Sequence, residues 1–151
     1  MAIINQVSFD HGKEQTVHDL ITRLSAQHLQ LEQALAGIRA RQFQTGEGRE
    51  RLHRVRDLLQ EHFKTEKQEL FPRLRQAVAG DAQLASQLSR FTDDLEIVSG
   101  LAEDFIRKYE NGVDHLIEFA TDHGALMTIL RIRLKREEET LFPLYRSLVR
   151  N

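Results

Sequence analysis

The sequence predicts an all-α protein, an up-down-up-down antiparallel four-helix bundle. Apolar residues recur at spacings of three and four along most of the chain, which is the pattern of amphipathic helices. Only 2 prolines occur in 151 residues. The breaks between the helical stretches are short, so neighbouring helices are expected to run antiparallel. The length suits one core, and we expect a single domain over residues 1–151.

The first two predicted helices cover residues 13–43 and 47–78. They are separated by the turn sequence Thr45-Gly46-Glu47-Gly48. His28 lies in the middle of the first apolar stripe, and His62 and Glu66 interrupt the second. Proline in a helix interior costs about 3 kcal/mol, so Pro72 predicts a kink or a helix end.

The last two predicted helices cover residues 81–110 and 113–149. Asp81 is a candidate cap for the first of them. Its inward stripe is predicted to contain Phe91, Asp94, Leu95, Val98, Leu101, Phe105 and Tyr109. Asp94 is therefore expected to place a carboxylate on an apolar face. The last helix carries Arg133 and Glu137 on its apolar stripe, and Pro143 predicts a second kink or helix end.

The chain contains an internal repeat at an offset of 71 residues. The repeat aligns Glu66 with Glu137 and Leu70-Phe71-Pro72 with Leu141-Phe142-Pro143. His62 and Glu66 are four residues apart and share one helix face, a spacing that suits two ligands of one metal ion. The second copy keeps the glutamate but has Arg133 where the first has His62. Arginine offers no lone pair, so it cannot be a ligand.

Composition excludes several function classes. The net charge of -2 gives no basic surface for nucleic acid and no sign of a membrane partner, so neither is predicted. Cysteine is absent, and any metal must therefore be held by nitrogen and oxygen atoms, which suits iron, manganese or zinc. The first residues lack the pattern of a signal peptide, and a cytoplasmic protein is expected.

These motifs resemble the hemerythrin-like, HHE cation-binding domain family over nearly the whole chain. The resemblance implies a four-helix bundle that holds non-haem iron. It implies metal ligands at His28, His62, Glu66 and Glu137. Asp94 and Arg133 stand where that family supplies two further histidines, so we interpret them as replaced ligands or as partners of the ligands. A buried Arg133 is expected to contact Asp94, Glu66 or Glu137, with Asp94 the favoured partner.

The resemblance implies one or two iron ions. Because Arg133 is interpreted as replacing one of them, one iron ion is expected, with a di-iron site, zinc or manganese, and a metal-free core as the alternatives. The implied function is sensing or handling of oxygen, nitric oxide, peroxide or iron, with a small diatomic or peroxide ligand. Two alternatives remain at this point: a metal-free bundle with a vestigial polar core that acts as a binding scaffold, and a non-haem iron oxidoreductase. No catalytic residue is assigned. A monomer or a homodimer is expected.

Overall fold

The computed structural model describes residues 2–150 and, for side chains, residues 16–149. The helices are α1 (Ala2–Ala36), α2 (Glu47–Thr65), α3 (Phe71–Ala77), α4 (Ala82–Tyr109), α5 (Leu116–Arg136) and α6 (Phe142–Arg150). The π-helical turn η2 (Glu66–Leu70) joins α2 to α3, and η3 (Glu137–Leu141) joins α5 to α6 in the same way. A short 3-10 helix, η1 (Ala40–Gln44), lies between α1 and α2. The part of the chain that the structure describes contains no strand.

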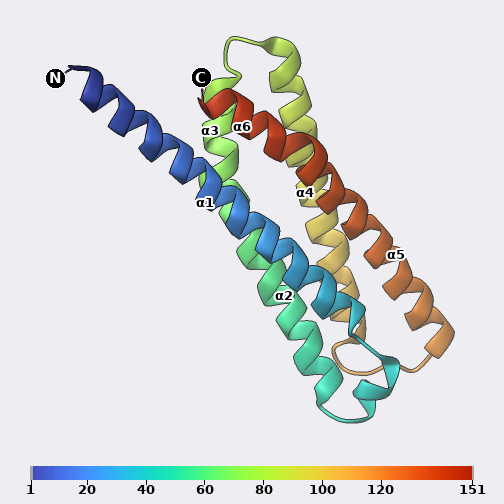
Figure 1. Cartoon of the computed structure of the whole chain (residues 1–151). Coiled ribbons are helices and arrows are strands. Elements are labelled where there is room, and N and C mark those ends of the chain that lie inside the picture. The colour runs from blue at the N-terminus through green and yellow to red at the C-terminus, as the bar shows by residue number, and fades with distance from the viewer. Residues whose placement is uncertain (1, 151) are drawn as a thin grey trace.

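These elements form the predicted four-helix bundle (Figure 1). The continuous pairs α2–α3 and α5–α6 each act as one long helix, so the four long members are α1, α2–α3, α4 and α5–α6. Helix α1 packs against α2 on one side and against α5 and α6 on the other, while α4 packs between α2 and α5. The core is mostly leucine and phenylalanine, with the ring of Tyr145 fully buried. Among the described helices, none has both the length and the apolar composition of a membrane span.

The first connection differs from the prediction, because α1 ends at Ala36 and not near residue 43. Gly37 follows, and glycine has a low helix propensity. Arg39 then adopts an extended backbone, and its side chain donates to the carbonyl oxygens of Ala36 and Ile38. Ile38 is 1% exposed, so its burial in the core fixes where the chain turns.

Both prolines are accommodated without a helix end. The Phe71 amide bonds to the carbonyl of Glu66, five residues earlier, which is the π-helical pattern. Pro72 then lies in the first turn of α3, the part of a helix in which proline is best tolerated. The second repeat does the same, with the Phe142 amide bonded to Glu137. The predicted kink thus takes the form of a π turn, and each π turn begins at one of the two repeated glutamates.

The predicted inward face of α4 is wrong at two positions, and at each of them the next residue along the chain is the buried one. Leu95 and Ala102 are buried, whereas Leu101 is 40% exposed and Asp94 is half-exposed. Asp94 therefore lies at the shoulder of the helix and not on its apolar face. The predicted cap of this helix is confirmed, since Asp81 Oδ1 accepts hydrogen bonds from the amides of Gln83 and Leu84, both at 3.1 Å.

Gly48 is required by close packing at the start of α2. A Cβ atom there would lie 2.6 Å from the ring of Phe43, which also contacts Phe119 edge-on. We expect Gly48→Ala to lower the free energy of unfolding by about 1–3 kcal/mol, the usual range for overpacking. Gly100→Ala, in mid-α4 with open space around it, is the control and should instead raise that energy by about 0.5–1 kcal/mol. Urea denaturation measures both changes, and equal effects would contradict the packing argument.

Candidate metal centre

Five charged or titratable side chains meet in the middle of the bundle, and each is at most 3% exposed. His28 comes from α1, and His62 from the last turn of α2. Arg133 comes from the last turn of α5, and Glu66 and Glu137 are the first residues of the two π turns. The structure therefore brings together all four residues that the sequence predicts as ligands, and it adds Arg133 to them.

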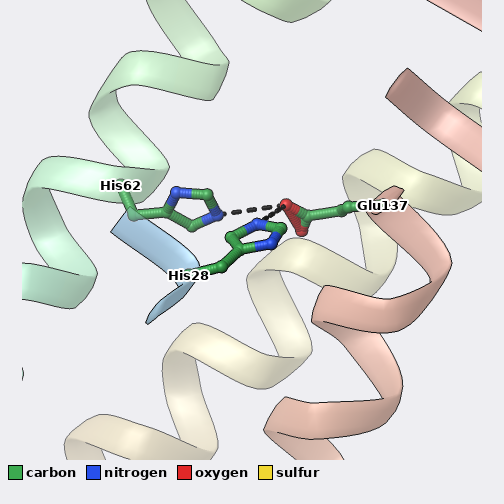
Figure 2. A group of neighbouring side chains, drawn as sticks. All are labelled: His28, His62 and Glu137. Atoms are coloured by element: carbon green, nitrogen blue, oxygen red, sulfur yellow. Dashed lines mark hydrogen bonds and ion pairs between the residues drawn. The ribbon is translucent and has the colours of Figure 1, made fainter. Parts of the chain in front are cut away.

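Glu137 lies at the centre of this group (Figure 2). Its Oε1 atom is 3.1 Å from His28 Nε2 and 3.0 Å from His62 Nε2. One donor atom from each of these three residues lies within 4.8 Å of the others. Ligand atoms about 2.0–2.2 Å from a metal ion lie roughly 3 Å or slightly more from one another, so this spacing suits a shared ion.

Glu66 lies beside His62 but outside the three-residue group of His28, His62 and Glu137, and the protein alone satisfies it poorly. Its Oε1 atom is 2.9 Å from His62 Nε2, yet the contact does not have hydrogen-bond geometry. Both Glu66 carboxylate oxygens are buried without a hydrogen-bond partner among the described residues. A buried carboxylate without partners is costly, and a cation beside it removes that cost.

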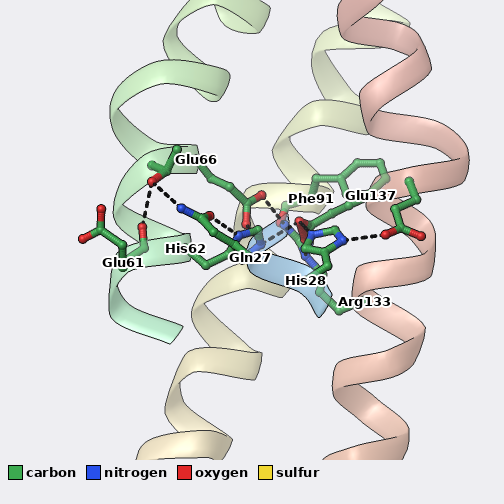
Figure 3. A network of polar contacts seen from close by, with 10 residues as sticks. Gln27, His28, Glu61, His62, Glu66, Phe91, Arg133 and Glu137 are labelled. Carbon is green, nitrogen blue, oxygen red and sulfur yellow. Dashed lines mark hydrogen bonds and ion pairs between the residues drawn. The ribbon is translucent and has the colours of Figure 1, made fainter. Parts of the chain in front are cut away.

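A chain of hydrogen bonds fixes the orientation of His62 (Figure 3). The Thr65 hydroxyl donates to the carbonyl of Glu61 at 2.8 Å, so it is left to accept from Gln27 Nε2 at 3.3 Å. The amide oxygen of Gln27 must then face His62 Nδ1, 2.8 Å away. Because that oxygen only accepts, Nδ1 carries a proton and Nε2 faces the centre. Such partners orient metal-binding histidines.

His28 has an equivalent partner in Glu138, whose Oε1 atom lies 2.9 Å from Nδ1. Neither Gln27 nor Glu138 is indicated by the sequence pattern. Glu138 is 51% exposed, and helical periodicity places it on a solvated face. The repeat does not reveal it either, because its counterpart in the first copy is Lys67. Only the approach of α1 to the second π turn brings this carboxylate to His28.

The buried groups shift one another's protonation. Burial alone would lower the pKa of His62, but contacts with the Glu137 and Glu66 carboxylates outweigh burial and raise the pKa to about 9. Burial, together with the neighbouring charge of Glu137, raises the pKa of Glu66 to about 7. Burial opposes the ionisation of Glu137, yet hydrogen bonds from both histidines and the charge of Arg133 hold its pKa far below the usual range. Glu137 is thus the permanent anion of the centre.

Arg133 supplies the permanent cation. Its Nε donates to Glu137 Oε2 at 3.0 Å, and Nη1 donates to the backbone carbonyl of Phe91 at 2.6 Å. The Nη2 atom lies 3.8 Å from Glu66 Oε2 and has no hydrogen-bond partner among the described residues. The predicted contacts with the two glutamates are therefore present.

The favoured partner predicted for Arg133 is wrong. Asp94 instead forms an ion pair with Arg136 at 3.6 Å, and its side chain is 45% exposed. The physical reason is that the inward face of α4 is shifted by one residue from the predicted one. Asp94 therefore lies at the shoulder of the helix and points away from the core. At this level α4 presents the ring and the carbonyl of Phe91, so Asp94 is neither a candidate ligand nor the partner of Arg133.

Two other histidines, His123 and His53, lie apart from this group. His123 Nε2 donates a hydrogen bond to the carbonyl oxygen of Leu35 at 2.7 Å, because a carbonyl oxygen only accepts. Its ring stacks on Phe119. His53 is paired with Glu110 at 3.3 Å. Neither His123 nor His53 contacts the buried cluster.

The fold and this centre define a class of protein: an antiparallel four-helix bundle with a buried histidine and carboxylate cluster contributed by three of its helices. A family model, the hemerythrin HHE cation binding domain, matches residues 19–145. The chain belongs to this family. No curated protein and no solved structure matches the chain.

We expect Gln27→Leu to weaken metal binding by about 10–100-fold, the usual effect of removing a partner that orients a metal-binding histidine. The substitution leaves His62 free to present either nitrogen to the centre. Titration with a competing chelator measures the dissociation constant. Gln30→Leu is the control, because Gln30 is exposed on the same helix. A Gln27→Leu protein with unchanged affinity would contradict the role of this chain of hydrogen bonds.

Proposed function

We propose that the protein binds one metal ion per chain, with His28, His62, Glu66 and Glu137 as its ligands, and that the native ion is iron. The single observation that carries this proposal is the pair of buried, unpartnered oxygens of Glu66 beside His62. Family membership supports cation binding in general. A donor set of two imidazoles and two carboxylates suits iron, and zinc or manganese are the alternatives.

The residues around the proposed ion have distinct tasks. Gln27 and Glu138 orient the two histidines, so that both Nε2 atoms face the centre. Glu137 would hold the ion through Oε1, since its Oε2 accepts a hydrogen bond from Arg133. A bound iron ion would supply a Lewis acid with coordination positions left open for a small ligand.

Arg133 supports a count of one ion over two. The guanidinium lies against Glu137 and near Glu66, with its positive charge where a second cation would have to share the same carboxylates. Two cations at that distance would repel each other, and arginine stays protonated at any physiological pH. We therefore propose a mononuclear site, and with it a role in sensing or handling oxygen, nitric oxide, peroxide or iron.

One observation favours a second candidate function, a metal-free scaffold. Glu137 already receives hydrogen bonds from Arg133 and from both histidines, so part of the polar layer is satisfied by the protein alone. In that case His62 would be protonated at neutral pH, because the neighbouring carboxylates raise its pKa to about 9. The unpartnered Glu66 oxygens are the feature that this alternative leaves unexplained.

Elemental analysis of protein purified from iron-supplemented cells decides between them. The proposal expects close to one iron per chain and a higher melting temperature than that of chelator-treated protein. A ligand at 100 times its dissociation constant adds about 2.7 kcal/mol to the free energy of unfolding. Protein that is folded, metal-free and unchanged in stability when iron, zinc or manganese is added would overturn the proposal and leave the scaffold.

A further inference from the structure

We propose that the exposed faces of α4 and α5 form a two-fold symmetric interface with a second copy of this chain. This inference goes beyond the metal centre and does not depend on a bound ion. Three features of the described surface lead to it: a patch of exposed apolar side chains, a hollow within that patch, and two opposite charges placed evenly on either side of Ile97.

The apolar patch lies where α4 and α5 pack side by side (Figure 1). Seven large apolar side chains of the described residues are exposed, and four of them gather here: Ile97 and Leu101 on α4, and Ile129 and Ile132 on α5. Ile97 is 60% exposed and Ile132 is 49% exposed. Single exposed apolar residues are ordinary on a monomer, whereas a contiguous patch of them marks an interaction site.

A hollow of about 200 Å³ lies within this patch, between the two helices. Most of its walls are apolar and come from Ile97, Val98, Ile129 and Ile132. Asp94 and Arg136, at one end of the hollow, form an ion pair with each other and so leave no net charge beside it. Grooves between helices receive the side chains of a facing helix, and the apolar walls of this one fit apolar side chains.

The charges on α4 identify the partner as a second copy. Arg90 lies seven residues before Ile97, and Asp104 lies seven residues after it. Seven residues are about two helical turns, so the three side chains lie on one stripe of α4, with each charge about 10 Å from Ile97 along the axis. Arg90 and Asp104 are both exposed, and neither forms an ion pair with another described residue.

A two-fold axis through Ile97 turns the second α4 end for end. It therefore places Arg90 opposite Asp104 of the partner subunit, and the symmetry makes the same ion pair a second time. The apolar patches of the two copies then face each other between these pairs. The charged groups at the far end of the face, Lys108 and Asp122, are already paired within the chain at 2.8 Å.

The size of this face suits a dimer of moderate affinity. At about 1.5 Å per residue, the 28 residues of α4 and the 21 residues of α5 give helices about 42 and 32 Å long. Two helices side by side are about 20 Å wide, so two copies would bury about 1,200 Å² in total. This area is at the lower end of the range for specific interfaces, and we expect a dissociation constant in the micromolar range.

Sedimentation velocity of the full chain tests the interface. Wild-type protein should be mostly dimeric at about 100 μM, and Arg90→Asp should weaken the dimer at least tenfold, because each attractive pair becomes two facing carboxylates. The exchange variant Arg90→Asp/Asp104→Arg restores opposite charges and should return the dissociation constant to within about threefold of the wild-type value. Arg54→Asp is the matched control, because Arg54 is exposed on α2 and lies outside this face.

Ile97→Asp should leave the chain monomeric at about 100 μM, since it places two carboxylates on the two-fold axis. Ile132→Asp, on α5, replaces that variant if its circular dichroism shows less helix than the wild type. A wild-type chain that is monomeric at this concentration overturns the proposal, and so does a dimer that persists in Ile97→Asp. An exchange variant weakened as much as Arg90→Asp alone also overturns it.

Discussion

Replacing His62 with alanine should abolish metal binding at stoichiometric concentrations, with an affinity loss above 100-fold. The substitution removes a proposed ligand outright, and this effect exceeds the loss of about 10–100-fold that follows from removing a ligand's hydrogen-bond partner. His62 is also the link between the two carboxylates, since its Nε2 lies within 3.0 Å of an oxygen from each. Without it, the remaining donors no longer enclose one position.

The measurement is metal content after gel filtration, together with a competition titration. His53→Ala is the matched control, because His53 lies on the same helix but pairs with Glu110 outside the centre. Circular dichroism must show that both variants keep the helical content of the wild type. A folded His62→Ala protein that retains one ion at wild-type affinity would exclude His62 as a ligand.

Replacing Glu137 with glutamine should lower the free energy of unfolding of the metal-free protein by about 3–5 kcal/mol. Glu137 is the anion that Arg133 and both histidines share, and all four groups are buried. Its removal leaves the guanidinium as a buried charge with Glu66 3.8 Å away as its only remaining carboxylate among the described residues. Removing one partner of a buried ion pair is strongly destabilising for this reason.

Urea denaturation in the presence of a chelator measures this loss. Glu139→Gln makes the same chemical change two residues away, where the side chain is 64% exposed and its only ion pair within the described part of the chain, with Lys135, spans 3.8 Å. That control should change the free energy of unfolding by about 0.5 kcal/mol or less. Equal stability losses in the two variants would show that the ion pairs of Glu137 contribute nothing to the fold.

The sequence was sufficient to predict the bundle, and it placed the repeated glutamates Glu66 and Glu137 on core-facing stripes, where both are buried. Helical periodicity identifies which side of each helix faces the core, and the repeat marks Glu137 as the counterpart of Glu66. The sequence was not sufficient to predict where the helices end. The π turns at both prolines and the early end of α1 depend on which backbone groups find partners across a turn, and apolar spacing does not contain that information.

Contacts between helices were the part that only the tertiary structure decided. Neighbouring residues of a helix are about 100° apart around its axis, so a small error in its rotation moves a side chain from the core to the shoulder. That is what separates Asp94 from Arg133 and leaves it with Arg136. The partners of the two histidines, Gln27 and Glu138, depend in addition on how far one helix is displaced along another. The sequence by itself determined that the two repeated glutamates lie on the apolar stripes of their helices. The packing of the helices determined which side chains at the edges of each stripe enter the core, and which buried groups touch.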